Sequence, residues 1–158
     1  MRDPCGSWHS ANRTSQTGGV PWHQDRVVAL KTRCETPGYG RWVGQGDFWH
    51  AEPPLALLEK MIFARVYLDD SNAANGAMEF ALGSHKQGRV AAGDAARIAA
   101  DSEIEIENAR RGDVLFLKGL TLHRSGRAAK AAQRRIVRID FAVREELDEG
   151  LEWALPQN

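Results

Sequence analysis

Short apolar runs separated by glycine, proline and asparagine recur along the chain, a pattern typical of β-strands joined by turns. It predicts strands over 62–70, 77–83, 112–119, 120–123 and 133–143. Because the Asn75-Gly76 pair between the first two tolerates positive φ, we expect them to form an antiparallel hairpin. The run GDVLFLKG predicts a turn followed by a buried strand, and the alternation in LTLH predicts a half-buried strand ending near His123.

Helical patterns are few. The two prolines before LALLEKM favour a short helix with proline in its first turn, and AGDAARIAADSE at 92–103 predicts a second, surface helix. The stretch from Thr36 to Gly46 reads as a loop, and the prolines of WHAEPP favour a turn over a strand. Many short strands with few helices predict a mostly β fold, a double-stranded β-helix of the jelly-roll or cupin-like type.

Composition indicates one compact domain. The 158 residues are 42% hydrophobic and suggest a single unit, with an N-terminal stretch at 1–19, a core at 20–143 and a C-terminal extension at 144–158. Basic and acidic residues balance at 21 each, so charge gives no reason to expect nucleic acid or an anionic membrane as a partner.

The two cysteines and the N-terminal residues bear on disulfides, zinc binding and cellular location. Cys5 and Cys34 lack CxxC spacing, so neither a disulfide framework nor a zinc site is indicated. The first residues, MRDPCGSW, lack the apolar run of a secretory signal, and we therefore expect a cytoplasmic protein.

The segment PWHQD carries the strongest chemical signal. On a strand, His23 and Asp25 would point to the same side, and His123 follows 100 residues later. Two histidines and one carboxylate form the facial triad of non-haem Fe(II) oxygenases. The alternative is a surface histidine beside an aspartate. His50 with Glu52 is a weaker rival pair, and His9 and His85 rank lower as metal ligands.

The run QRRIVRIDFAV predicts a strand that carries several arginines. A buried guanidinium needs an anionic partner, and a carboxylate fits it bidentately, so a dicarboxylate cosubstrate would supply that partner. The alternative is an edge strand whose arginines are solvated or paired with neighbouring acids. The arginines are Arg134, Arg135 and Arg138, and the neighbouring acids are Asp140 and Glu145.

From about Val20 to Val143 the chain resembles the phytanoyl-CoA dioxygenase-like family of Fe(II)/2-oxoglutarate-dependent oxygenases. The resemblance rests on four blocks in the family's order: VPWHQD, YLDDSNAANGAMEFALGSHKQG, RRGDVLFLKGLTLHRSG and RRIVRIDFA. It implies iron ligation by His23, Asp25 and His123.

The resemblance also implies a cosubstrate site. A serine two positions and an arginine eleven positions after the second histidine hold the C5 carboxylate of 2-oxoglutarate, which here are Ser125 and Arg134. Arg135 is the competitor for that role, and Arg65 is either a further carboxylate contact or an ordinary surface arginine. Gln24 and Arg138 are expected substrate contacts.

The implied activity is hydroxylation of an unactivated C–H bond of a small molecule, with succinate and carbon dioxide as co-products. Two alternatives stay open: a non-catalytic binding module, and a cupin-like metalloenzyme that does not use 2-oxoglutarate. Only 22 residues precede His23, and their polar sequence has little apolar surface for a sheet strand. We therefore expect an open sheet edge, which a second copy in a homo-oligomer would cover.

Overall fold

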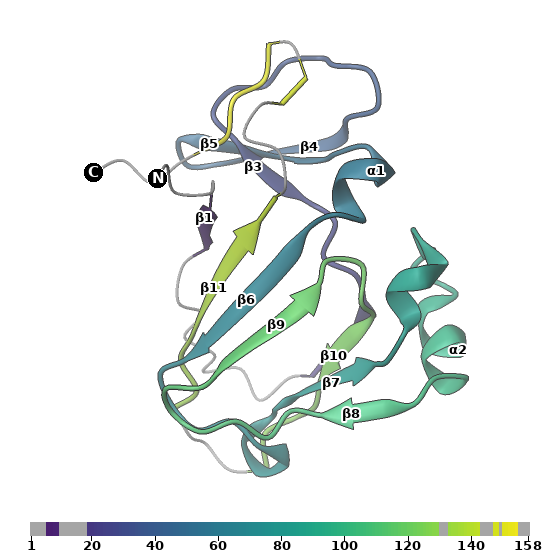
Figure 1. Ribbon diagram of the computed structural model, residues 1–158, viewed down its shortest axis with the longest axis vertical. Helices are drawn as coiled ribbons and strands as arrows, with labels where there is room; N and C mark the ends of the chain where they lie inside the picture. Colours follow the sequence, from purple (N-terminus) through teal and green to yellow (C-terminus); the bar gives the residue numbers. More distant parts are fainter. Residues whose placement is uncertain (1–5, 10–18, 130–132, 143–146, 149, 155–158) are drawn as a thin grey trace.

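Antiparallel strands in three sheets dominate the computed structural model, which describes residues 6–9, 19–129, 133–142, 147–148 and 150–154 (Figure 1). The first sheet has the order β1 (Gly6–His9), β11 (Ile136–Phe141), β6 (Ile62–Tyr67) and β9 (Val114–Lys118). The second has the order β2 (Val20–His23), β10 (His123–Ser125), β7 (Met78–Ala81) and β8 (Ile104–Ile106). The third has the order β3 (Val28–Leu30), β5 (Phe48–Glu52) and β4 (Gly40–Gln45).

The first and second sheets face each other, and polar side chains bridge them. From β6, the hydroxyl of Tyr67 donates to Glu107, which directly follows β8. From β11, Arg138 donates to Asp25, which lies just beyond β2. Two four-stranded antiparallel sheets in this arrangement confirm the prediction of a mostly β, jelly-roll-type fold.

The third sheet carries much of the hydrophobic core and differs from the prediction. Its residues Val28, Leu30 and Ala51 pack with side chains of α1 and β6. The loop expected at 36–46 contains β4, and the turn expected at WHAEPP is β5. The prolines do not prevent this strand, because they come directly after Glu52 and every residue of β5 keeps its N–H donor.

Short helices cover the ends of the sheets. The segments predicted as helical contain α1 (Leu55–Leu58) and α2 (Ala95–Ala100), and the 3₁₀ turns are η1 (Ala73–Asn75) and η2 (Ser84–Gln87). Ala95 and Ala99 of α2 are buried in a cluster with Ala81, which ends β7, and Leu122, which directly precedes β10. The helix therefore packs against the second sheet. Among the described residues, no helix has the length and apolarity needed to cross a membrane.

The predicted hairpin of residues 62–83 is wrong. β6 belongs to the first sheet and β7 to the second, so residues 68–77 carry the chain from one sheet to the other. Two local contacts hold this connection in place. Asn72 caps η1 within it, and Ser71 forms an isolated β-bridge with Ala109. Gly76 takes the positive φ expected at the turn, at 79°. The positive φ of the turn was therefore predicted correctly, but the pairing of β6 with β7 was not.

Two further strand predictions need correction. β9 is not buried on both faces: Val114 and Phe116 are 47% and 65% exposed, while the alternating residues Leu115 and Leu117 are half-buried. His123 begins β10 and does not end a strand.

The expected open edge also differs. Residues Gly6–His9 form β1, which pairs with β11 at the edge of the first sheet. Main-chain pairing of this kind needs no apolar side chains, which explains why composition did not reveal it. The homo-oligomer expected to cover that edge stays a prediction.

Candidate metal centre

Three side chains converge at the end of the second sheet. His23 closes β2, His123 opens β10, and the two face each other directly in the ladder, with ring centroids 4.3 Å apart. Asp25 follows β2 by two residues. One donor atom from each of the three lies within 4.8 Å of the others, and no second group of three such side chains converges within the described part of the chain. This arrangement suits a metal ion held by two imidazoles and one carboxylate.

Both histidines are oriented by the same local bond. His23 Nδ1 lies 2.7 Å from the carbonyl oxygen of Pro21, and His123 Nδ1 lies 2.9 Å from that of Thr121. A carbonyl only accepts, so each Nδ1 carries the proton and each Nε2 keeps a lone pair. Both Nε2 atoms point toward Asp25, at 3.7 Å from His23 to Oδ1 and 3.3 Å from His123 to Oδ2. The imidazoles are therefore in the tautomer that binds a metal through Nε2.

Asp25 is held ionised by its neighbours. Burial alone would raise its pKa, but its neighbours, among them the positively charged Arg138, outweigh burial and lower the pKa well below its usual range. Arg138 binds Asp25 through one nitrogen and chelates the buried carboxylate of Asp140 through two others, at 2.6 and 3.0 Å. The guanidinium thus fixes the carboxylate oxygen that it contacts.

The pairing of β2 with β10 depends on an irregularity. His123 pairs with His23, whereas Ser125 pairs with Val20, so β2 contains one extra residue at Pro21 or Trp22. Ser125 Oγ accepts from the Val20 amide at 3.3 Å. A Cβ on Gly19 would lie 2.9 Å from the Ser125 carbonyl oxygen, so a glycine is required for this close approach.

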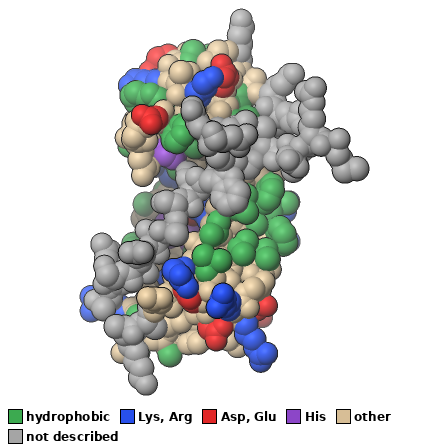
Figure 2. All heavy atoms as spheres, turned by 90° about the vertical axis from the view of Figure 1, so that its left-hand side faces the viewer, with side chains coloured by type: hydrophobic (Ala, Val, Ile, Leu, Met, Phe, Trp, Pro, Cys, Tyr) green, Lys and Arg blue, Asp and Glu red, His purple; other side chains and the backbone are tan. Residues whose placement is uncertain are grey.

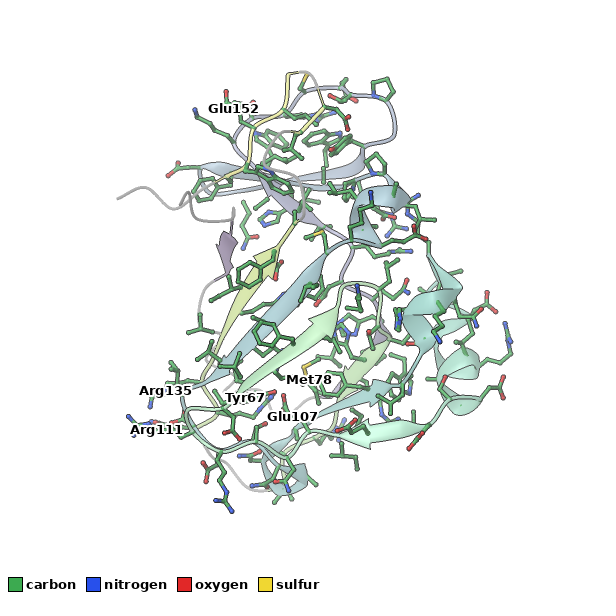
Figure 3. All side chains as sticks on the ribbon, in the orientation of Figure 1. Tyr67, Met78, Glu107, Arg111, Arg135 and Glu152 are labelled. Carbon is green, nitrogen blue, oxygen red and sulfur yellow. The ribbon has the colours of Figure 1, made fainter. Side chains whose placement is uncertain are left out.

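A second group of polar side chains is buried between the first two sheets. It lies next to Met78, the register partner of Ser125. At its centre is Glu107, whose side chain is 2% exposed. One carboxylate oxygen accepts from the Tyr67 hydroxyl and, at 3.4 Å, from Arg65 Nε. The other accepts from Ser71 Oγ at 2.6 Å and from the Met78 amide at 3.1 Å. Figure 3 shows Tyr67, Met78 and Glu107 close together between the strands.

Arg134 and Arg135 have different environments. The side chain of Arg134 is 13% exposed and its Nη1 lies 3.7 Å from Glu107, where it is buried with no hydrogen-bond partner among the described residues. Arg135 points outward and chelates Asp69 at the surface, with two contacts of 2.9 Å (Figure 3). Of these two arginines, Arg134 is therefore the one placed to meet an anion between the sheets.

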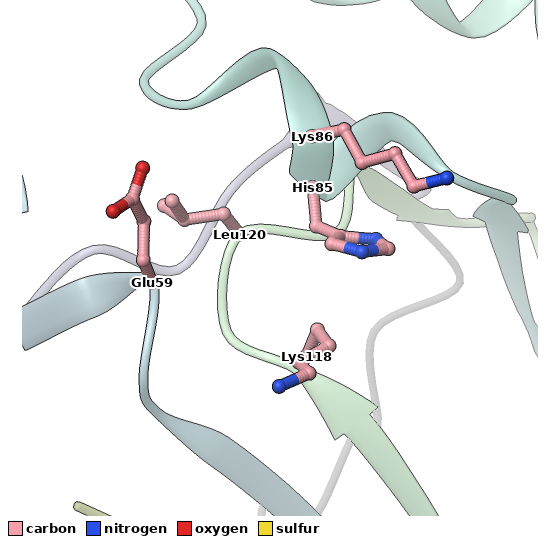
Figure 4. Close-up of a pocket in the computed structure, with 5 residues that line it drawn as sticks. All are labelled: Glu59, His85, Lys86, Lys118 and Leu120. Atoms are coloured by element: carbon pink, nitrogen blue, oxygen red, sulfur yellow. The ribbon is translucent and has the colours of Figure 1, made fainter. Parts of the chain in front are cut away.

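Gln24 faces away from the metal centre and joins two loops. Its amide donates to the carbonyls of Gly88 and Leu120 and accepts from the Val90 amide, at 2.7 to 2.9 Å. These loops border a cavity of about 210 Å³. The cavity is lined by Glu59, His85, Lys86, Lys118 and Leu120 (Figure 4). A substrate contact by Gln24 stays a prediction, as does one by Arg138.

The rival pair is not a metal site. Glu52 is surrounded by Arg26, Arg41 and Arg89, the last at 2.9 Å, so its carboxylate is engaged by cations. Sequence reasoning missed Glu107 altogether. The run EIEIEN alternates, but nothing in it distinguishes the buried Glu107 from the exposed Glu105.

Comparisons with known proteins show the family and the fold of this chain. The family model of phytanoyl-CoA dioxygenase (PhyH) matches residues 3–136. No curated protein matches the chain. The structure of AviO1 from Streptomyces viridochromogenes Tue57 is similar with a TM-score of 0.55 and 20% identity, over 96% of this chain and 53% of that chain. A nickel complex of the non-haem monooxygenase ThoJ gives 0.53 and 18%, over 97% and 55%.

A third structure, EvdMO1, gives a TM-score of 0.52 and 22% identity, over 78% of this chain and 23% of that chain. At these identities the likeness shows a shared fold. The chain spans about half the length of the first and second of these structures. Because the family model covers most of the sequence, including His23, Asp25 and His123, the chain belongs to the phytanoyl-CoA dioxygenase family.

Proposed function

We propose that this chain is the core of an Fe(II)/2-oxoglutarate-dependent dioxygenase that hydroxylates an unactivated C–H bond of a small molecule. The observation that carries the proposal is the convergence of His23, Asp25 and His123, with their donor atoms within 4.8 Å of one another. Family membership and the non-haem oxygenase named among the similar structures support the same reaction class.

The donor set fits a divalent iron ion. Two neutral imidazoles and one carboxylate suit Fe(II), and they occupy one face of the ion, which leaves other positions for ligands. Arg138 keeps Asp25 ionised and oriented, and the backbone carbonyls of Pro21 and Thr121 keep both Nε2 atoms free of protons. Outer contacts of this kind fix the orientation of metal ligands.

The residues beyond the metal centre fit a dicarboxylate. Arg134 Nη1 is a buried donor without a hydrogen-bond partner in the described residues, which is the position where a bound carboxylate would be stabilised. Ser125 lies two residues along β10 from His123, on the same side of the strand, and offers a hydroxyl. Arg134 and Ser125 would therefore bind the distal carboxylate of 2-oxoglutarate.

With both groups bound, the iron and the oxo acid supply the oxidation: one atom of O₂ enters succinate as carbon dioxide leaves, and the other enters the substrate. The chain contributes position and charge. His23, Asp25 and His123 hold the metal at the edge of the space between the sheets, and Arg134 and Ser125 orient the cosubstrate. The three chain ligands carry one negative charge among them.

Anaerobic titration tests the proposal. The melting temperature is measured with Fe(II) alone and then with increasing 2-oxoglutarate, since a ligand that binds only the folded state raises it. We expect both to stabilise the protein, and His123→Ala to abolish both effects. Arg134→Gln should need at least about tenfold more 2-oxoglutarate, because it removes a charge-assisted contact. Arg135→Gln, which changes the neighbouring but outward arginine, is the matched control and should stay within twofold.

The titration distinguishes the two alternatives to this function. Stabilisation by Fe(II) with no response to 2-oxoglutarate would favour the cupin-like metalloenzyme that does not use this cosubstrate. No response to either would favour the non-catalytic binding module. After admission of O₂, formation of succinate from 2-oxoglutarate by the wild type, and not by Asp25→Ala, tests turnover independently of the substrate.

A further inference from the structure

Glu107 is a buried carboxylate that the iron centre does not use. It receives four hydrogen bonds from Tyr67, Arg65, Ser71 and the Met78 amide. Burial alone would raise its pKa, but the charge of Arg65 and these hydrogen bonds outweigh burial and lower the pKa below its ordinary value. A carboxylate buried and ionised in this way needs a local reason, because an isolated buried charge is strongly unfavourable.

The charges around Glu107 do not cancel. Two guanidinium groups face the one carboxylate: Arg65, hydrogen-bonded at 3.4 Å, and Arg134, at 3.7 Å without a hydrogen bond. The side chains of Arg65 and Arg134 are 14% and 13% exposed, so water screens them little. Among the described residues, the group therefore has one net positive charge, and the donor without a hydrogen-bond partner belongs to Arg134.

The group adjoins the expected cosubstrate site. Met78, whose amide binds Glu107, is the register partner of Ser125 on the neighbouring strand. Ser125, Met78 and Glu107 therefore lie in one row across the second sheet, and Arg134 approaches that row from the first sheet. A carboxylate held by Ser125 and Arg134 would lie beside Glu107 and would feel its charge.

We propose that Glu107 is a positioning residue for the cosubstrate, which neutralises Arg65 and leaves a single net positive charge at Arg134 for one distal carboxylate. This inference rests on the proposed function, because it assigns the cosubstrate carboxylate to Arg134. It makes Glu107 the residue that sets how strongly the pocket prefers an oxo acid with a distal carboxylate over one without.

The proposal predicts opposite effects for the two partners. Removing the charge of Glu107 leaves two positive charges for one carboxylate and strengthens its binding. Removing the charge of Arg65 leaves Glu107 to offset Arg134 and weakens binding. Removing both restores the original balance. If Arg65 instead contacted the cosubstrate directly, the double variant would stay as weak as the Arg65 variant.

The test uses the Fe(II)-loaded full chain without O₂, and the Kd is obtained from the thermal shift. The ligands are 2-oxoglutarate and 2-oxopentanoate, whose distal methyl group carries no charge. We expect Glu107→Gln to bind 2-oxoglutarate at least fivefold more tightly and 2-oxopentanoate unchanged within twofold. Arg65→Gln should bind 2-oxoglutarate at least fivefold more weakly, and the double variant should return to within twofold of wild type. The matched control is Glu105→Gln, which removes the same charge from an exposed position of β8 and should match wild type.

Unchanged or weaker binding of 2-oxoglutarate by Glu107→Gln overturns the inference, as does a double variant that stays weak. If Glu107→Gln does not melt cooperatively, Arg65→Gln and the double variant decide. In these outcomes wild type still binds 2-oxoglutarate, and the proposed function stands. Failure of wild type to bind 2-oxoglutarate overturns the proposed function, and the inference with it.

Discussion

At the residue scale, the pairing of His23 with Asp25 is a local signal, whereas His123 follows 100 residues later and was joined to them through the family resemblance. His23 and Asp25 are two positions apart, and each histidine is oriented by the carbonyl two residues before it. Contacts of this kind depend on the backbone next to the residue and not on the whole fold. The choice between Arg134 and Arg135 was harder, because the two arginines are adjacent on one predicted strand and both were candidates for the same role. Asp69, distant in sequence, binds Arg135 at the surface, and no local pattern predicts this pairing.

The pH dependence of stability is predicted at this scale from Glu107. A carboxyl whose pKa is lower in the folded than in the unfolded chain stabilises the fold above its ordinary pKa, near 4.5 for glutamate. That stabilisation is lost as the pH falls through the lowered pKa. We therefore expect the free energy of unfolding of wild type to fall as the pH drops below about 4.5, and that of Glu107→Gln to fall less.

Urea denaturation at a series of pH values measures this difference. Glu105→Gln is again the control, because its carboxyl is exposed on the same short strand. Its curve should run parallel to that of wild type. Parallel curves for wild type and Glu107→Gln would show that the carboxyl of Glu107 does not contribute to stability through its ionisation.

At the element scale, both helices and several strands followed from the sequence, but strand pairing did not. β6 and β7 were both predicted as strands, and Gly76 takes the expected positive φ. Their separation into two sheets depends on β9, β10 and β11, which come much later in the chain. β4 and β5 were missed because glycine and proline were given more weight than the apolar residues between them. The third sheet also needs Ala154, whose amide binds the carbonyl of Ala29.

Gln24 gives an element-scale prediction, because one side chain joins β2 to two loops. Gln24→Ala removes partners from the carbonyls of Gly88 and Leu120 and from the Val90 amide. Unsatisfied buried groups are costly, and we expect the free energy of unfolding to fall by about 2–3 kcal/mol. The measurement is urea denaturation of the apo chain. Gln45→Ala, at an exposed position of β4, should change stability by no more than about 0.5 kcal/mol. Equal effects of the two substitutions would refute the joining role.

At the scale of the whole molecule, polar chemistry lies between the first two sheets and an apolar surface lies outside the first. Phe116 of β9, Ala64 of β6 and Ile139 of β11 follow one another across the sheet, and Val114, Val66 and Val137 form the next row. Alternation along each strand puts both rows on the outer face. Phe116 and Val114 are exposed there, and Ala64 between its larger neighbours is buried. Val66, Val137 and Ile139 are half-buried. Figure 2 shows hydrophobic side chains gathered at mid-height on one side of the molecule, at the level of the first sheet. The apolar run in GDVLFLKG predicted a buried strand. Its apolar residues instead alternate between the inner face of the sheet and this outer face.

An exposed apolar sheet face favours association with another copy of the same chain, since a two-fold axis places the same rows against each other. We expect the sedimentation coefficient of wild type to rise with concentration, and Phe116→Lys to suppress that rise. Because Phe116 is 65% exposed, the substitution should change the free energy of unfolding by no more than about 0.5 kcal/mol. Val43→Lys is the matched control, because Val43 is 60% exposed on the third sheet, and it should associate like wild type. A wild type that sediments as a monomer at every concentration, or equal suppression by both lysines, would mean that the outer face of the first sheet does not drive self-association.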